Sequence, residues 1–110
     1  MNFNFKNQTR EKIDVALRDA RYHYIGINPK DNKVEFTRPF GQNPYPRFHL
    51  FLKTKDEVNI NASLHLDQIK PRFEGTTAHN ADYDSELITN EAKRIQDFFE
   101  MSKASRDKDF

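Results

Sequence analysis

The chain has 110 residues, which is enough for one domain and too few for a second domain with its own core. Hydrophobic residues make up 35% and charged residues 32%, so the core is expected to be thin and to depend on ten phenylalanines and four tyrosines. The formal net charge of +1 argues against a purely electrostatic nucleic-acid binder, and the lack of cysteine excludes disulfides and thiolate metal sites. Without a long apolar run or a signal peptide, the sequence predicts a soluble cytoplasmic protein with no membrane partner.

The first predicted element is a helix that begins after Thr9, a suitable N-cap, and extends to Tyr22. Its apolar residues recur at helical spacing, which predicts one buried face. They are Ile13, Ala16, Leu17 and Ala20.

A β-hairpin is predicted next, because two β-prone runs flank the turn sequence Pro29-Lys30-Asp31-Asn32. A four-residue loop would pair Ile27 with Val34 and Ile25 with Phe36. Tyr24 would then lie on the opposite, open face of the sheet.

The second hairpin shows strict alternation, which predicts one buried and one open face. The buried row is Phe48, Leu50 and Leu52, followed after a turn near residues 55–57 by Val58, Ile60, Ala62, Leu64 and Leu66. The open row is Arg47, His49, Phe51 and Lys53, followed by Asn59, Asn61, Ser63, His65 and Asp67. A three-residue turn would place His49 opposite Ser63, and a register shifted by two residues would place it opposite His65. The two histidines share a face in both registers.

The C-terminal part combines a long loop, a helix and a tail. Residues 71–83 show no periodicity and predict a long loop, a feature that is often functional in small domains. Asp84 or Ser85 caps a second helix, whose inner stripe is Ile88, Ala92, Ile95 and Phe99. Residues 1–101 are predicted to form the domain, and residues 102–110 a frayed tail.

These elements predict an α+β fold. In the order α-β-β-β-β-α, they would form a two-layer sandwich with a four-stranded antiparallel sheet and both helices on one face. The other face of the sheet is left open, and three interpretations of it compete.

The first interpretation is a metal site. His49, His65, Asp67 and His79 are ligand types that suit a divalent metal, and a metal held there would activate water or oxygen in a metal-dependent enzyme. The second interpretation is RNA or DNA binding, with Phe51 and Tyr24 stacking on bases. An α-β-β-β-α order also occurs in double-stranded-RNA-binding domains, but this chain has an additional predicted strand and lacks the aromatic motif of RNA-recognition modules.

The third interpretation is a solvated face, or one covered by a second copy of the chain in a homodimer. Glu35 and Asp67 then act as ion-pair partners for Arg47, Arg38 or Lys53.

Taken together, the sequence favours a small soluble binding domain over an enzyme. Its ligand is not identified by the sequence, no cofactor is expected, and its partner would be another protein or a second copy of the chain in a homodimer. Its contact surface would be the open face and the 71–83 loop. The predicted ligand-binding residues are Arg47, His49, Phe51, His65, Asp67 and His79.

The segment from Arg47 to Phe99 contains an R-F-H strand, an H-L-D-Q-x-K-P strand end, an A-H loop and an E-A-x-R-I helix. With these motifs, roughly the C-terminal half of the chain resembles a small uncharacterised prokaryotic domain family. That family has no assigned activity, so the resemblance implies a single compact domain and no residue roles.

Overall fold

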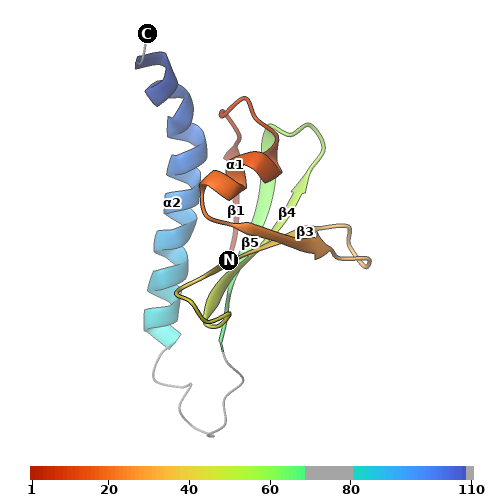
Figure 1. Ribbon diagram of the computed structural model, residues 1–110, viewed down its shortest axis with the longest axis vertical. Coiled ribbons are helices and arrows are strands. Elements are labelled where there is room, and N and C mark those ends of the chain that lie inside the picture. Colours follow the sequence, from red (N-terminus) through yellow and green to blue (C-terminus); the bar gives the residue numbers. More distant parts are fainter. Residues whose placement is uncertain (69–80, 109–110) are drawn as a thin grey trace, which may run out of the picture.

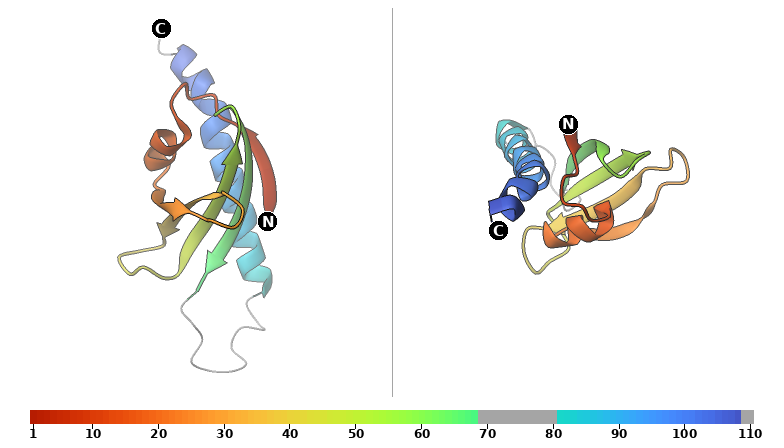
Figure 2. Two further views of the ribbon diagram at one scale, coloured as in Figure 1. Left: turned by 90° about the vertical axis from the view of Figure 1, so that its right-hand side faces the viewer. Right: turned by 90° about the horizontal axis from the view of Figure 1, so that it is seen from above.

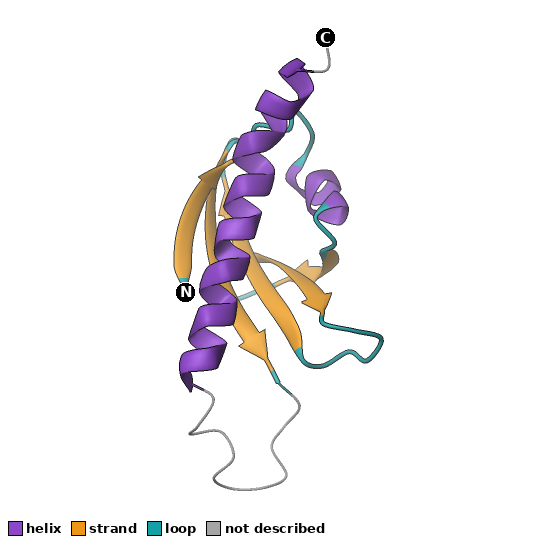
Figure 3. Cartoon of the chain, turned by 90° about the vertical axis from the view of Figure 1, so that its left-hand side faces the viewer, coloured by secondary structure: helices purple, strands orange, loops and turns teal. Residues whose placement is uncertain are grey.

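The computed structural model describes residues 1–68 and 81–108, and for residues 81–83 and 102–108 it describes the backbone alone. Its elements are β1 (Asn2–Lys6), α1 (Ile13–Asp19), β2 (His23–Ile27), β3 (Val34–Pro39), β4 (Arg47–Thr54), β5 (Asn59–Asp67) and α2 (Ala81–Lys108). The strands form one antiparallel sheet in the order β1-β5-β4-β3-β2. The long helix α2 runs beside this sheet (Figures 1 and 3), so the α+β class is confirmed.

The sheet has five strands, so the predicted four-stranded sheet was wrong by one. The missing strand is β1, which pairs with β5 from Asn2 opposite Ser63 to Lys6 opposite Asn59. Its sequence carries the period of a half-buried strand, because Phe3 and Phe5 alternate with polar residues. This pattern spans only five residues, which is short for an argument from periodicity.

The first hairpin is confirmed in its turn and corrected in its register. Ile27 pairs with Val34 as predicted, but a bulge between Tyr24 and Gly26 places Tyr24, and not Ile25, opposite Phe36. Directly paired residues share a face, so the predicted place of Tyr24 on the open face was wrong. The Tyr24 ring meets Phe36 edge-on at 5.8 Å. The hairpin projects away from α2 (Figures 1 and 2), which leaves Tyr24 58% exposed.

The helix α1 is shorter than predicted. It begins at Ile13 and not after Thr9, the predicted N-cap, because Arg10 adopts a left-handed backbone conformation with φ 66°, which a helix starting at Thr9 would not allow. The helix ends at Asp19, and Arg21 then adopts a left-handed backbone conformation with φ 74°. The predicted extension to Tyr22 was therefore wrong.

The helix α2 begins at Ala81, before the predicted cap at Asp84 or Ser85. Residues 81–83 thus belong to the helix, while residues 71–80 of the predicted loop lie outside the described residues. The backbone stays helical to Lys108, and the fraying of the 102–110 tail stays a prediction.

One hydrophobic cluster joins both helices to the same face of the sheet. Its largest fully buried side chains are Tyr22, Phe36, Phe99, Leu17, Leu50, Leu52, Ile60, Leu64 and Ile95. The alternation along β4 and β5 supplies most of the strand side of this core, as predicted. Val58 is an exception, because it lies in the turn before β5 and is 45% exposed.

A buried carboxylate on α2 connects this helix to β3 and to the segment between α1 and β2. Glu91 is 5% exposed and accepts hydrogen bonds from the Tyr22 hydroxyl at 2.6 Å and from Arg94 at 2.7 and 2.9 Å. Arg38 donates to the same carboxylate at 3.3 Å, and Arg94 also reaches the carbonyl of Ala20 at 3.0 Å. Burial, followed by the charge of Glu91, raises the pKa of Tyr22. The phenol therefore stays protonated and acts as a hydrogen-bond donor.

The edge strand β1 is also fastened to α2. The side-chain amide of Gln96 donates to the carbonyl of Asn4 at 3.0 Å, and the backbone amide of Gln8 donates to the carbonyl of Phe99 at 3.2 Å.

Within the described part of the chain, neither helix has the length and apolar character needed to cross a membrane.

Candidate functional site

The open face of the sheet carries the odd-numbered side chains of β4 and β5, as predicted. His49 pairs directly with His65, and Arg47 pairs with Asp67. The register is therefore the one that brings the two histidines opposite each other.

A charged cluster of Glu35, Arg47, His49 and Asp67 occupies one half of this face. The two ring nitrogens of His49 lie 2.7 Å from carboxylate oxygens, Nδ1 from Asp67 and Nε2 from Glu35. Arg47 donates to the same Asp67 oxygen at 3.1 Å. Only a doubly protonated imidazole donates through both nitrogens, so the geometry fits an imidazolium between two carboxylates. The cluster satisfies its own charges and offers few free groups to a ligand.

Phe51 and His65 pack beside the charged cluster. The Phe51 ring stacks on His49, with centroids 4.2 Å apart and an angle of 16° between the planes, and meets His65 edge-on at 5.4 Å. The Nε2 atom of His65 lies 3.0 Å from the Ser63 hydroxyl. Desolvation, together with nearby positive groups that include His49, lowers the pKa of His65. His65 therefore favours the neutral form.

Of the predicted metal ligands, His49, His65 and Asp67 share the open face, but both nitrogens of His49 and one oxygen of Asp67 already have partners. Among the residues that the structure describes, no group of three histidine or carboxylate side chains is arranged to hold a metal ion. Both nitrogens of His49 face carboxylates, and His79 lies outside the described residues.

The other half of the open face differs in chemistry. It is a hollow of about 280 Å³ over β1, β5 and β4. Its lining, which we call the amide–lysine face, consists of Asn2, Asn4, Lys33, Phe51, Lys53, Asn61, Ala62 and Ser63. Asn61 lies between Asn4 and Lys53 in the strand register, so donors and acceptors follow one another across three strands. Within the described chain, the side chains of these asparagines and lysines form no hydrogen bond or ion pair with one another or with their surroundings.

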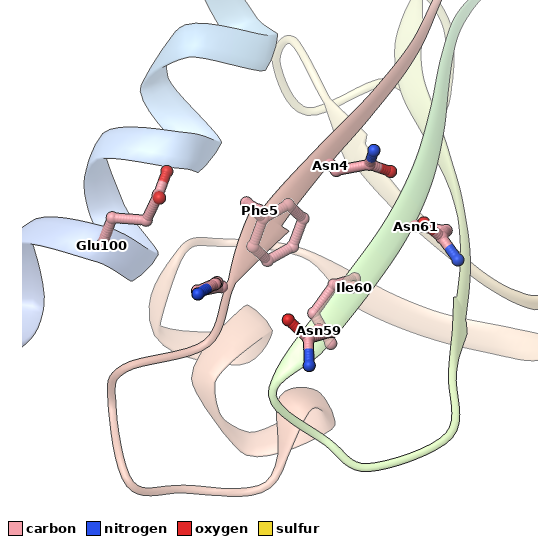
Figure 4. Close-up of a pocket in the computed structure, with 7 residues that line it drawn as sticks. Asn4, Phe5, Asn59, Ile60, Asn61 and Glu100 are labelled. Atoms are coloured by element: carbon pink, nitrogen blue, oxygen red, sulfur yellow. The ribbon is translucent and has the colours of Figure 1, made fainter.

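A second hollow of about 350 Å³ continues the amide row toward the end of β1 and the start of β5. Figure 4 shows Asn4, Asn59 and Asn61 on these neighbouring strands, with Glu100 on the facing helix. Asn59 is held by Asp56, whose carboxylate accepts the Asn59 side-chain amide at 2.8 Å. Asn4 and Asn61 line both hollows, so the two form one continuous polar strip.

Sequence reasoning placed Phe51, Lys53, Asn61 and Ser63 of the amide–lysine face on the open row, but of these it named only Phe51 as a ligand-binding residue. Asn2 and Asn4 were missed because β1 was not predicted, and Lys33 was missed because it precedes β3 in a turn. The signal that could have found the asparagines is the alternation Asn-Phe-Asn-Phe-Lys at residues 2–6.

Comparisons with known proteins give no assignment: no family model matches the chain, and neither a curated protein nor a solved structure matches it. The resemblance of the C-terminal half to an uncharacterised prokaryotic family therefore stays a prediction.

Proposed function

We propose that the protein is a binding domain that holds a polar, negatively charged ligand against the amide–lysine face. The observation that carries this proposal is the contrast between the two halves of the open face. The side chains of the charged cluster bond to one another. The side-chain amides of Asn2, Asn4 and Asn61 have no partner among the described residues, and they lie beside two lysines.

Single-stranded nucleic acid is the ligand class that this combination fits. Carboxamides both donate and accept, as the edges of unpaired bases require, and Lys33 and Lys53 would attract phosphates. Phe51 adds an aromatic wall to the hollow, on which a base or sugar would rest. Since only two lysines line the hollow and the formal net charge is +1, binding would be moderate in strength and sensitive to salt.

In this proposal the charged cluster supports the surface and does not contact the ligand. His49 stacks on Phe51 and thereby fixes the orientation of the aromatic wall. Glu35 and Asp67 hold the His49 ring in turn. Arg47, His49 and Asp67 would accordingly act as positioning residues, while His79 and residues 71–80 lie beyond the described chain.

The test is a fluorescence titration of labelled single-stranded uridine and thymidine oligonucleotides at low and moderate salt. We expect saturable binding that weakens as salt rises. Replacing Lys53 with glutamine, or Asn61 with alanine, should weaken binding by about three- to tenfold through the loss of a phosphate or base contact.

The matched control is Lys55→Gln, which removes an exposed lysine from the adjoining turn outside the hollow. Its binding should equal that of the unaltered protein. Binding that is absent at low salt, or that falls equally with Lys55→Gln, would contradict the proposal. Thermal unfolding of each variant separates a lost contact from a lost fold.

A further inference from the structure

A cleft lined by arginines lies outside the open face, where α1, β2 and the end of β3 meet. Its volume is about 460 Å³, within the range of small-ligand sites. The lining residues are Arg18, Arg21, His23, Arg38, Pro39, Phe40 and Gly41. It shares no residue with the amide–lysine face. In the left-hand view of Figure 2, α1, the start of β2 and the loop after β3 follow one another along one side of the molecule.

The cleft is positively charged and contains no carboxylate in its lining. Arg18 and Arg21 are exposed, and their side chains form no ion pair or hydrogen bond with any described residue. Arg38 does have a carboxylate partner, the buried Glu91, which Arg38 reaches with Nη1 at 3.3 Å. Glu91 also binds Arg94 at 2.7 Å, so its single negative charge is shared by two arginines. The site therefore keeps a positive excess.

The C-terminal end of α1 borders the cleft, and free helix carbonyls would repel an anion there. Three of the last four carbonyls of the helix are already occupied. Ala16, Leu17 and Arg18 accept backbone amides of residues 20–22, and Ala20 accepts the guanidinium of Arg94. The negative end of this short helix is thus largely neutralised before a ligand arrives.

The apolar side of the cleft is formed by Phe40, whose ring and backbone are both held by neighbouring residues. Phe40 is 46% exposed, yet its ring packs on Phe48 with centroids 4.7 Å apart. The Phe40 amide donates to the carbonyl of Pro46 at 3.1 Å, which closes the loop that carries it. The guanidinium of Arg38 lies 5.8 Å from the centroid of the same Phe48 ring. An aromatic surface and a guanidinium are therefore held side by side.

We propose that this cleft binds a small phosphorylated ligand, with the phosphate on Arg18, Arg21 and Arg38 and an organic ring against Phe40. Three planar guanidinium groups supply more donors than the two oxygens of a carboxylate accept, whereas a terminal phosphate has three oxygens and more charge. A mononucleotide or an aromatic phosphate monoester has the required chemistry. The proposal is independent of the function proposed for the amide–lysine face.

The first experiment titrates the isotope-labelled full chain with inorganic phosphate and with adenosine monophosphate, followed by amide NMR shifts and by calorimetry. We expect both to shift the amides of Arg21, His23, Phe40 and Gly41, and the nucleotide to bind more tightly because its base rests on Phe40. Shifts spread over the exposed lysines, or no saturation with either compound, would overturn the proposal. An oligonucleotide that binds the cleft far more tightly than the mononucleotide would also overturn it in favour of a nucleic-acid site.

A matched pair of arginine variants tests the charge. Arg21 and Arg10 are both exposed and both have left-handed backbones, with φ 74° and 66°, but Arg10 lies outside the cleft. Arg21→Gln should weaken binding of the nucleotide about tenfold, and Arg10→Gln should leave it unchanged. Equal losses in the two variants would contradict a local site.

A second pair leaves every arginine in place. A Cβ atom at Gly41 would meet nothing within 4 Å, so the position has room for a small side chain. Gly41→Asp puts a carboxylate at the rim of the cleft and should weaken binding about tenfold, while Gly41→Asn, of the same size and uncharged, should not. If the two variants bind equally, the cleft does not recognise negative charge.

Discussion

His49 shows how one side chain is defined by its neighbours. It is held by Glu35 and Asp67 at 2.7 Å each and covered by the ring of Phe51. A histidine on an open sheet face would ordinarily be solvated, but the side chain of His49 is only 12% exposed. The ion pairs and the stacked ring make it the centre of a small, partly buried network.

Replacing His49 with glutamine is expected to lower the free energy of unfolding by about 1–3 kcal/mol. Glutamine cannot donate to both carboxylates, so Glu35 or Asp67 is left without its donor while still partly desolvated. Urea unfolding at neutral pH measures the change. The control is His23→Gln, because His23 is exposed on the same sheet, and its effect should stay within about 0.5 kcal/mol. Equal effects would show that the network contributes nothing to stability.

The sequence predicted which residues of this network share a face, but it did not predict all of the ion pairs among them. Parity along β4 and β5 is enough to bring His49 and His65 together. Arg47 was among the partners considered for Asp67, and that pair is present at 3.1 Å. The partner of Glu35 is His49, which depends on the register between β3 and β4, a long-range feature that no local pattern contains.

At the scale of elements, Glu91 joins β3, α2 and the segment between α1 and β2 through polar bonds beside the apolar core. Its carboxylate accepts hydrogen bonds from Tyr22 just before β2, from Arg38 on β3 and from Arg94 on its own helix. These bonds fix how far α2 lies from the β2–β3 hairpin.

Glu91→Gln is expected to cost about 2–4 kcal/mol of unfolding free energy, because it leaves Arg38 and Arg94 without their counter-charge beside a buried site. Denaturant unfolding followed by circular dichroism gives the value. Glu86→Gln on the same helix is the control, since Glu86 is exposed, and it should change stability by less than about 0.5 kcal/mol. If Glu91→Gln left the free energy of unfolding unchanged, hydrophobic packing alone would position α2.

The sequence predicted elements best where the apolar period ran long. β4, β5 and the inner stripe of α2 have such patterns, and all three were found. The short β1 was not predicted. The start of α2 at Ala81 was also not predicted, because the residues before the expected cap show no helical period. The bulge in β2, which moves Ile25 out of its predicted pairing with Phe36, was not predicted either. A bulge leaves no mark on hydrophobic alternation.

At the scale of the whole molecule, one core cluster includes residues from both helices and from β1, β3, β4 and β5. In the part of the chain that the structure describes, the last residue of this cluster is Phe99. The folding unit is therefore expected to end close to Met101, and its elements are expected to unfold together.

Two truncations test this boundary. Removing residues 102–110 should change the unfolding free energy by less than about 0.5 kcal/mol, with coincident transitions by circular dichroism and tyrosine fluorescence. Removing residues 1–6 should cost at least about 3 kcal/mol, because it deletes Phe5, whose buried ring packs 4.7 Å from Phe99. A large loss from the C-terminal cut, or a small one from the N-terminal cut, would place the boundary elsewhere.

The bond from Gln96 to the carbonyl of Asn4 also bears on how the molecule behaves in crowded solution. The outer rim of a sheet invites strands from other molecules, and fibrils grow by such additions. Because the Gln96 side chain occupies the Asn4 carbonyl in the middle of β1, this edge of the sheet no longer has an uninterrupted row of free backbone groups for an incoming strand. Growth by strand addition is left to the opposite rim, β2, where the bulge at Gly26 interrupts the regular spacing that an incoming strand would need.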